Sequence, residues 1–302
     1  MTEESKERIL KLKTDRKAII LAHNYQPAVI QDIADMTGDS LELSRKAAST
    51  DAEVIVFCGV HFMAETAAIL NPGKVVLLPR LDAGCPMADM ITPEDMLSIK
   101  KENPGVPIVT YVNSTAAVKA ESTVCCTSAN SVKIVESFAG AETVYMTPDQ
   151  NLAKYTARHT GKRVLYWHGY CPIHHNLTAE EIRQRRKEHP DAMLLAHPEC
   201  RPEVIDLADA TTSTSGMLRH VRESSQESFI IATELGILYP MQKQNPGKRF
   251  YPASRSMVCP NMKKTTLKDV VRSLETLEPR VTVPEDTRLR ALGSVERMLE
   301  VI

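Results

Sequence analysis

The stretch Cys85-Pro86-Met87-Ala88-Asp89-Met90-Ile91-Thr92 recurs in outline twice more, as Cys171-Pro172 with Thr178 and as Cys259-Pro260 with Thr266. The three cysteines are 86 and 88 residues apart, and each threonine follows its cysteine by seven positions and opens a charged helical pattern. With 18 prolines and seven cysteines among 302 residues, less than one Cys-Pro pair is expected by chance. The spacing therefore predicts an internal repeat of about 87 residues that supplies one cysteine per copy.

Outside the Cys-Pro pairs, each copy repeats one order of elements. A Gly-Lys pair stands before each cysteine, and each copy starts with a buried apolar strand, at 18–22, 108–112 and 193–196. Two more strands follow in each copy, at 53–57 and 75–78, at 143–146 and 163–166, and at 229–232 and 249–251. Helical patterns lie between them, for example at 29–36 and 41–49. Such alternation is typical of a parallel sheet flanked by helices.

The repeat predicts an α/β fold of three homologous three-layer αβα domains with parallel sheets. We expect domains at residues 1–85, 86–171 and 172–259, with residues 260–302 packing back on the first. Three similar units most simply surround a pseudo-threefold axis, and ligands bind beyond the carboxyl ends of parallel strands. Polar residues at the strand ends and the three cysteines would then meet in one central cavity. The alternative is a linear array in which each cysteine only caps a helix.

Composition limits the class of protein. The hydrophobic content of 43%, the charged content of 25% and the net charge of −1 are those of an ordinary globular protein. Without a long basic run or a long apolar run, we expect neither a nucleic-acid partner nor a membrane partner. The charged N-terminal segment does not resemble a signal peptide, so we expect a cytoplasmic protein whose cysteines are reduced thiols or metal ligands.

Three thiolates that meet at one point form a metal site. Zinc with one open coordination position and a [4Fe–4S] cluster with one open iron both fit soft thiolate ligands. The wide spacing of Cys85, Cys171 and Cys259 resembles neither a zinc finger nor a ferredoxin. Spacing by itself leaves both metals open.

The residues around this site resemble the quinolinate synthase family. The resemblance extends over about residues 18–275 in the order and spacing of the family. It is carried by Ala22-His23-Asn24-Tyr25-Gln26, Gly38-Asp39-Ser40, Tyr111-Val112-Asn113-Ser114, His168-Gly169-Tyr170-Cys171-Pro172-Ile173-His174, His197-Pro198-Glu199-Cys200, Ser213-Thr214-Ser215-Gly216-Met217 and Cys259-Pro260-Asn261-Met262-Lys263. No Cys-x-x-Cys surrounds Cys259, so a disulfide redox switch at that position is not implied.

The resemblance implies an enzyme of NAD biosynthesis. Such an enzyme condenses iminoaspartate (iminosuccinate) with dihydroxyacetone phosphate and releases phosphate and two waters to give quinolinate. It would depend on another enzyme that supplies iminoaspartate. The resemblance also implies one oxygen-sensitive [4Fe–4S] cluster on Cys85, Cys171 and Cys259, whose open fourth iron acts as a Lewis acid.

Both substrates are anions, so the cavity needs hydrogen-bond donors. One hydroxyl per copy stands seventeen residues after the leading strand-end residue, at Ser40, Ser128 and Thr214, where helices are expected to begin. Helix N-termini favour phosphate and carboxylate groups. The alternative interpretation is three ordinary N-caps. The expected substrate-binding residues, with those implied by the family, are His23, Ser40, Tyr111, Val112, Asn113, Ser128, His197, Pro198, Glu199 and Thr214.

The condensation, the dehydrations and the ring closure all require proton transfer. We expect Glu199 to act as the base and His23 with Tyr25 to donate or relay protons. Tyr111 and Asn113 would orient a carboxylate or enolate oxygen. The remaining catalytic candidates are His197 and His174, which stands three residues after Cys171.

Two other functions are compatible with the sequence. A zinc-dependent aldolase or lyase for a triose phosphate would use the same three cysteines, and metal content distinguishes it. A non-enzymatic iron–sulfur sensor would need the cysteines but not the polar ring around them. The other four cysteines, at unmatched positions, are expected to be small buried hydrophobic residues: Cys58, Cys125, Cys126 and Cys200.

Overall fold

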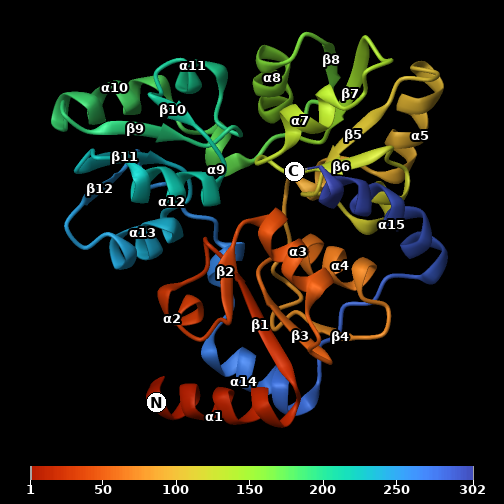
Figure 1. Cartoon of the computed structure of the whole chain (residues 1–302), viewed down its shortest axis with the longest axis vertical. Coiled ribbons are helices and arrows are strands. Elements are labelled where there is room, and N and C mark those ends of the chain that lie inside the picture. The colour runs from red at the N-terminus through yellow and green to blue at the C-terminus, as the bar shows by residue number, and fades with distance from the viewer. Residues whose placement is uncertain (1, 302) are drawn as a thin grey trace.

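The computed structural model describes residues 2–301, which form three separate four-stranded sheets. In chain order the sheets have the strand orders β2-β1-β3-β4, β6-β5-β7-β8 and β10-β9-β11-β12. Each pair of neighbouring strands is parallel. Helices flank each sheet, and the three units surround a common centre (Figure 1). The predicted α/β class with three αβα units is confirmed.

The first unit is built on two central strands that are apolar on both faces. Its elements are α1 Thr2–Asp15, β1 Ala18–His23, α2 Ala28–Gln31, β2 Met36–Gly38, α3 Ser40–Ser49, β3 Val54–Cys58, α4 His61–Leu70 and β4 Val75–Leu77. Ile20 and Val56 pack in one cluster with residues of α1, whereas Leu21 and Phe57 pack in another with residues of α3 and α4. Because helices cover both faces, the strands are continuous apolar runs and not alternating ones.

The second and third units repeat this plan. The second contains η1 Ala88–Met90, α5 Pro93–Glu102, β5 Ile108–Tyr111, α6 Ala116–Ala120, β6 Val124–Cys126, α7 Ser131–Glu136, β7 Thr143–Thr147, α8 Gln150–His159 and β8 Arg163–Tyr166. The third contains α9 Pro172–His175, α10 Ala179–Glu188, β9 Met193–Ala196, α11 Pro202–Ile205, β10 Ala210–Thr211, α12 Thr214–Glu223, β11 Ser228–Ala232, η2 Leu235–Ile237, α13 Leu238–Gln244 and β12 Arg249–Pro252.

Each sheet has one strand more than the sequence predicted. The additional strands are β2, β6 and β10, which lie at an edge of their sheets and contain three, three and two residues. The helix predicted at 29–36 is wrong in its second half, because α2 ends at Gln31 and Met36 begins β2. Such short edge strands depend on pairing with β1, β5 and β9, so no local apolar run indicates them.

The threonine that follows each Cys-Pro pair begins a helix, as predicted. Thr92, Thr178 and Thr266 are the N-caps of α5, α10 and α14 (Leu267–Thr276), and each forms a capping box with the acidic residue three positions later. In this arrangement the hydroxyl accepts an N–H while the carboxylate accepts the threonine N–H. The helix start is therefore set a fixed distance from each cysteine.

The C-terminal segment joins two units, not one. Helix α14 packs on α1 of the first unit. Helix α15 (Glu285–Glu300) instead packs mainly on α6 and β6 of the second unit, with further contacts to α4. No helix in the described part of the chain combines the length and the apolar character needed to cross a membrane.

Candidate active site

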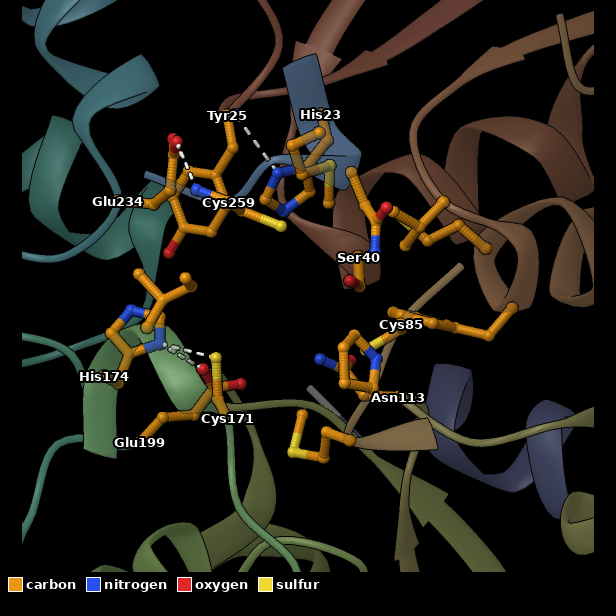
Figure 2. A pocket seen from close by; sticks show the side chains of 18 of the residues that line it. His23, Tyr25, Ser40, Cys85, Asn113, Cys171, His174, Glu199, Glu234 and Cys259 are labelled. Atoms are coloured by element: carbon orange, nitrogen blue, oxygen red, sulfur yellow. Dashed lines mark hydrogen bonds and ion pairs between the residues drawn. The ribbon is translucent and has the colours of Figure 1, made fainter. Parts of the chain in front are cut away.

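A cavity of about 270 Å³ lies where the three units meet. Residues of all three units line it, and Figure 2 shows the labelled side chains around one open space. The residues that line it are His23, Tyr25, Asp39, Ser40, Val60, Phe62, Met63, Gly84, Cys85, Pro86, Met87, Tyr111, Asn113, Thr127, Ser128, Cys171, Pro172, Ile173, His174, His197, Glu199, Thr214, Glu234, Cys259, Pro260, Asn261 and Met262. None of these residues is a lysine or an arginine.

Most of the candidate residues from the sequence line this cavity, because they lie at or beyond the carboxyl ends of the parallel strands. Val112 and Pro198 do not line it. The Val112 side chain is buried in the core, and its backbone N–H bonds the Cys126 carbonyl at 2.9 Å. Pro198 is also buried, between two residues that do face the cavity.

Cys85, Cys171 and Cys259 meet at the cavity from three different units, each after the fourth strand of its sheet. Backbone N–H groups two or three residues further along the chain bond each thiol and lower its pKa. Burial outweighs them, and the pKa of Cys85 rises to about 12. The Cys85 thiol also influences the pKa of Cys171 and is influenced by Cys259, so the three sulfur atoms share one environment.

This donor set fits a metal centre. Half-buried thiols that receive backbone N–H donors are suited to hold a negative charge once a cation is bound. Among the described residues, one group of ligand atoms is already compact: Cys171, His174 and Glu199 place theirs within 4.8 Å of one another. The three cysteines with this neighbouring pair therefore form a candidate metal centre.

His23 and His197 occupy equivalent positions and form the same local turn. The Nδ1 atom of each accepts a backbone N–H two residues later, from Tyr25 at 3.1 Å and from Glu199 at 3.3 Å. Burial lowers the pKa of both imidazoles to about 3, so they are neutral at pH 7. With Nδ1 accepting, the ring proton of each neutral imidazole is assigned to Nε2.

Glu199 is a buried carboxylate of the site, and it is 3% exposed. Burial raises its pKa, but the His174 and His197 imidazoles and a hydrogen bond from Tyr111 outweigh burial and lower it to about 2. Burial and the Glu199 charge raise the pKa of Tyr25 and Tyr111 well above 10. At neutral pH the site therefore contains the ionised Glu199 beside two protonated phenols.

Thr233 connects two of these groups, and sequence reasoning missed it. Its hydroxyl oxygen lies 2.5 Å from the Tyr25 phenolic oxygen and 2.8 Å from His174 Nε2. On the other side of that imidazole, Nδ1 lies 2.6 Å from a Glu199 oxygen and 3.2 Å from the Cys171 sulfur. Because ionised Glu199 can only accept, Nδ1 carries the proton and Nε2 accepts from Thr233.

Two of the three hydroxyl residues begin a helix, as expected, and one does not. Ser40 and Thr214 are the first residues of α3 and α12, but Asp39 and Ser213 are the N-caps. Ser128 lies in the turn before α7, which begins at residue 131. None of the three is the N-cap of its helix, so the interpretation as ordinary N-caps is wrong for them, and all three line the cavity.

Sequence reasoning also missed two buried carboxylates beside the cysteines. Asp149 follows β7 and Glu234 follows β11, at the position that Val60 occupies after β3. The Asp149 carboxylate accepts the backbone N–H of Cys171, and the Glu234 carboxylate accepts that of Cys259. The alignment of the copies contained a signal, since two of three equivalent positions are acidic at the end of an apolar strand. The other four cysteines are buried, as expected.

Comparison with known proteins gives a consistent result over nearly the whole chain. The family model described as Quinolinate synthetase A protein matches residues 7–300. A protein named quinolinate synthase from Geotalea uraniireducens is 54% identical over 99% of this chain and 98% of its own. Proteins of the same name from Thermodesulfovibrio yellowstonii and Desulforudis audaxviator are 53% and 55% identical, over 100% and 99% of both chains.

Proposed function

This chain belongs to the Quinolinate synthetase A family and is an enzyme of NAD biosynthesis, and we propose that it condenses iminoaspartate (iminosuccinate) with dihydroxyacetone phosphate. The products are quinolinate, phosphate and two waters. The observation that carries the proposal is the meeting of Cys85, Cys171 and Cys259 at a cavity that also contains a hydroxyl–imidazole–carboxylate array. An enzyme that makes the unstable imine must supply the first substrate, and reduced thiols suit a cytoplasmic reaction.

We assign Cys85, Cys171 and Cys259 as the ligands of one [4Fe–4S] cluster. Three protein ligands leave one iron open, and when bound the cluster supplies a Lewis acid that polarises a substrate oxygen. Support comes from the three half-buried cysteines, which come from three units and whose thiols receive backbone N–H donors.

The substrate anions are held without a cationic side chain, since no lysine or arginine lines the cavity. Ser40 and Thr214 place hydroxyls and helix N-termini at its wall, where the positive end of the helix dipole favours carboxylate and phosphate. Asn113 adds an amide whose Oδ1 is buried with no hydrogen-bond partner in the described chain. An unpaired buried amide oxygen indicates a partner supplied by a ligand.

The proton-transfer roles follow from the hydrogen-bond array. Glu199, with its lowered pKa, is a weak base but stabilises a protonated His174 at 2.6 Å. We therefore assign the proton acceptor to His174 Nε2, acting through the Thr233 hydroxyl, and we modify the assignment of Glu199 as base. Tyr25 donates its only O–H to Thr233, so its oxygen accepts at the cavity side and a proton taken there passes through Thr233 to His174. The neutral His23 and His197 orient the substrate through Nε2–H.

The first test is chemical. Protein purified without oxygen is analysed for iron, sulfide and zinc, and quinolinate formation is then assayed. Four irons with matching sulfide, lost in Cys171→Ala and Cys85→Ala but kept in Cys58→Ala, would support the cluster and its ligands. Stoichiometric zinc without visible absorbance would favour the zinc aldolase. A full cluster without quinolinate formation would favour the sensor.

A further inference from the structure

All three Cys-Pro turns share one backbone anchor. The residue that begins the helix after the third strand of each unit donates its N–H to the carbonyl two residues before the cysteine. These bonds are His61 to Ala83 at 2.8 Å, Gln150 to Gly169 at 2.9 Å and Leu235 to Met257 at 2.9 Å. The three turns are therefore equivalent in this respect.

A second anchor exists in two of the three units. Asp149 Oδ2 accepts the Cys171 N–H at 3.1 Å, and Glu234 Oε1 accepts the Cys259 N–H at 3.1 Å. Figure 2 shows the bond from Cys259 to Glu234 at the edge of the cavity. In the first unit the equivalent residue is Val60, and within residues 2–301 the Cys85 N–H has no acceptor. The pseudo-threefold arrangement is broken at this point.

Both carboxylates are held rigidly. Asp149 is 1% exposed, and its Oδ1 accepts the N–H groups of Asn151 and Leu152 at 2.7 Å as the N-cap of α8. Glu234 is fully buried; its Oε2 accepts the Gly236 N–H at 2.7 Å, and its Oε1 lies 2.8 Å from Lys263 Nζ. Every oxygen is occupied by a donor. An amide in place of either carboxylate would oppose an N–H with its own NH₂ group.

We infer that Asp149 and Glu234 are positioning residues, which hold the backbone of Cys171 and Cys259 rigidly as cluster ligands. Cys85 lacks this second anchor, so its backbone is the most mobile of the three ligands. The inference rests on the proposed cluster. Groups that orient a ligand change metal affinity about tenfold or more when they are lost. The iron bound by Cys85 is then the iron that is lost first. Loss of either carboxylate makes the backbone of a second cysteine ligand mobile.

The variants are chosen so that the fold is retained. Asp149→Ser keeps a good N-cap for α8 but is too short to reach the Cys171 N–H. Glu234→Gln keeps the volume of the side chain and removes one acceptor oxygen. Asp209→Asn is the matched control, because its Oδ2 accepts the Leu194 N–H at 2.7 Å at the start of β9 and not at a Cys-Pro turn.

Two measurements on the full-length protein test the inference. Amide hydrogen exchange should be slower at Cys171 and Cys259 than at Cys85 in the wild type, and Asp149→Ser should accelerate exchange at Cys171. In reconstituted protein, a chelator should remove iron about tenfold faster from Asp149→Ser and Glu234→Gln than from the wild type and Asp209→Asn.

The outcomes distinguish failure of the positioning role from failure of the proposed cluster. A wild-type cluster with unchanged iron loss and unchanged exchange in both variants would overturn this inference and leave the proposed function intact. Wild-type protein that binds neither iron nor sulfide would overturn the cluster and this inference with it. Faster iron loss restricted to Asp149→Ser and Glu234→Gln, with Asp209→Asn like the wild type, would support both.

Discussion

The phenolic oxygen of Tyr25 lies 2.5 Å from the hydroxyl oxygen of Thr233, and this hydrogen bond joins the first unit to the third. The same hydroxyl bonds His174, so one small side chain connects a phenol to an imidazole–carboxylate pair. The connection exists only when the two units are packed together. It gives the site a hydrogen-bonded route by which a proton moves between the phenol and the imidazole.

Thr233→Val should abolish that route with little effect on the fold, because valine has the same shape without the hydroxyl. We expect turnover to fall by about 10²–10⁴-fold, the range typical of lost acid–base catalysis, with the iron content unchanged. Steady-state quinolinate formation measures it. Thr156→Val is the control, since its buried hydroxyl bonds Ser131 on α7 and not the site. Wild-type turnover in Thr233→Val would remove Thr233 from the mechanism.

Glu199→Gln should retain the metal and lose turnover. The neutral amide keeps a hydrogen bond to His174 but cannot stabilise a positive charge on the imidazole, as the carboxylate at 2.6 Å can. We expect a fall of about 10²-fold or more in kcat. Iron analysis and the quinolinate assay are made on the same preparation. Loss of iron together with activity would show instead that Glu199 serves the metal centre.

The buried histidines predict how stability depends on pH. Burial lowers the pKa of His197 from 6.5 to about 3, so between these values the unfolded chain binds a proton that the folded chain does not. The free energy of unfolding should therefore decrease as the pH falls through this window, by up to roughly 1.4 kcal/mol per pH unit for this group. The free energy of unfolding is measured with denaturant at several pH values between 6.5 and about 4.5. In His197→Gln it should decrease less steeply with falling pH than in the wild type. Ser128→Ala, which changes no titratable group, should keep the wild-type slope.

Loss of a capping box after a Cys-Pro pair should lower the stability of the fold without changing the activity. Thr266→Ala removes the hydroxyl that accepts the Asp269 N–H at 3.3 Å at the start of α14. We expect the free energy of unfolding to decrease by about 1 kcal/mol, as for other lost N-caps, with activity retained. Thermal unfolding and the quinolinate assay measure the two effects. Loss of activity at unchanged stability would contradict this assignment.

Much of the site could be predicted from the sequence because its signals are local. A parallel strand covered on both faces must be an apolar run, and its polar residues gather where it ends. The equivalent strand ends at His23, Tyr111 and His197 therefore identified the cavity wall. Local hydrogen bonding likewise specifies the helix starts at Thr92, Thr178 and Thr266, because each capping box lies within four residues.

Long-range contacts account for what sequence reasoning missed. Thr233 resembles any threonine at a strand end until packing places Tyr25 and His174 on either side of it. The two-residue strand β10 exists only because β9 pairs with it. Helix α15 has no local feature that directs it to α6 rather than α1.

By itself, the sequence determined three equivalent units, three cysteines and the polar residues at the strand ends, because periodicity and local hydrogen bonding specify these features. The tertiary structure alone decided which of these residues touch. It placed Thr233 between Tyr25 and His174, and it set Asp149 and Glu234 behind two cysteines but Val60 in the first unit. The physical reason is that a hydrogen bond needs its two atoms within about 3 Å, and between units only the packed chain provides that proximity.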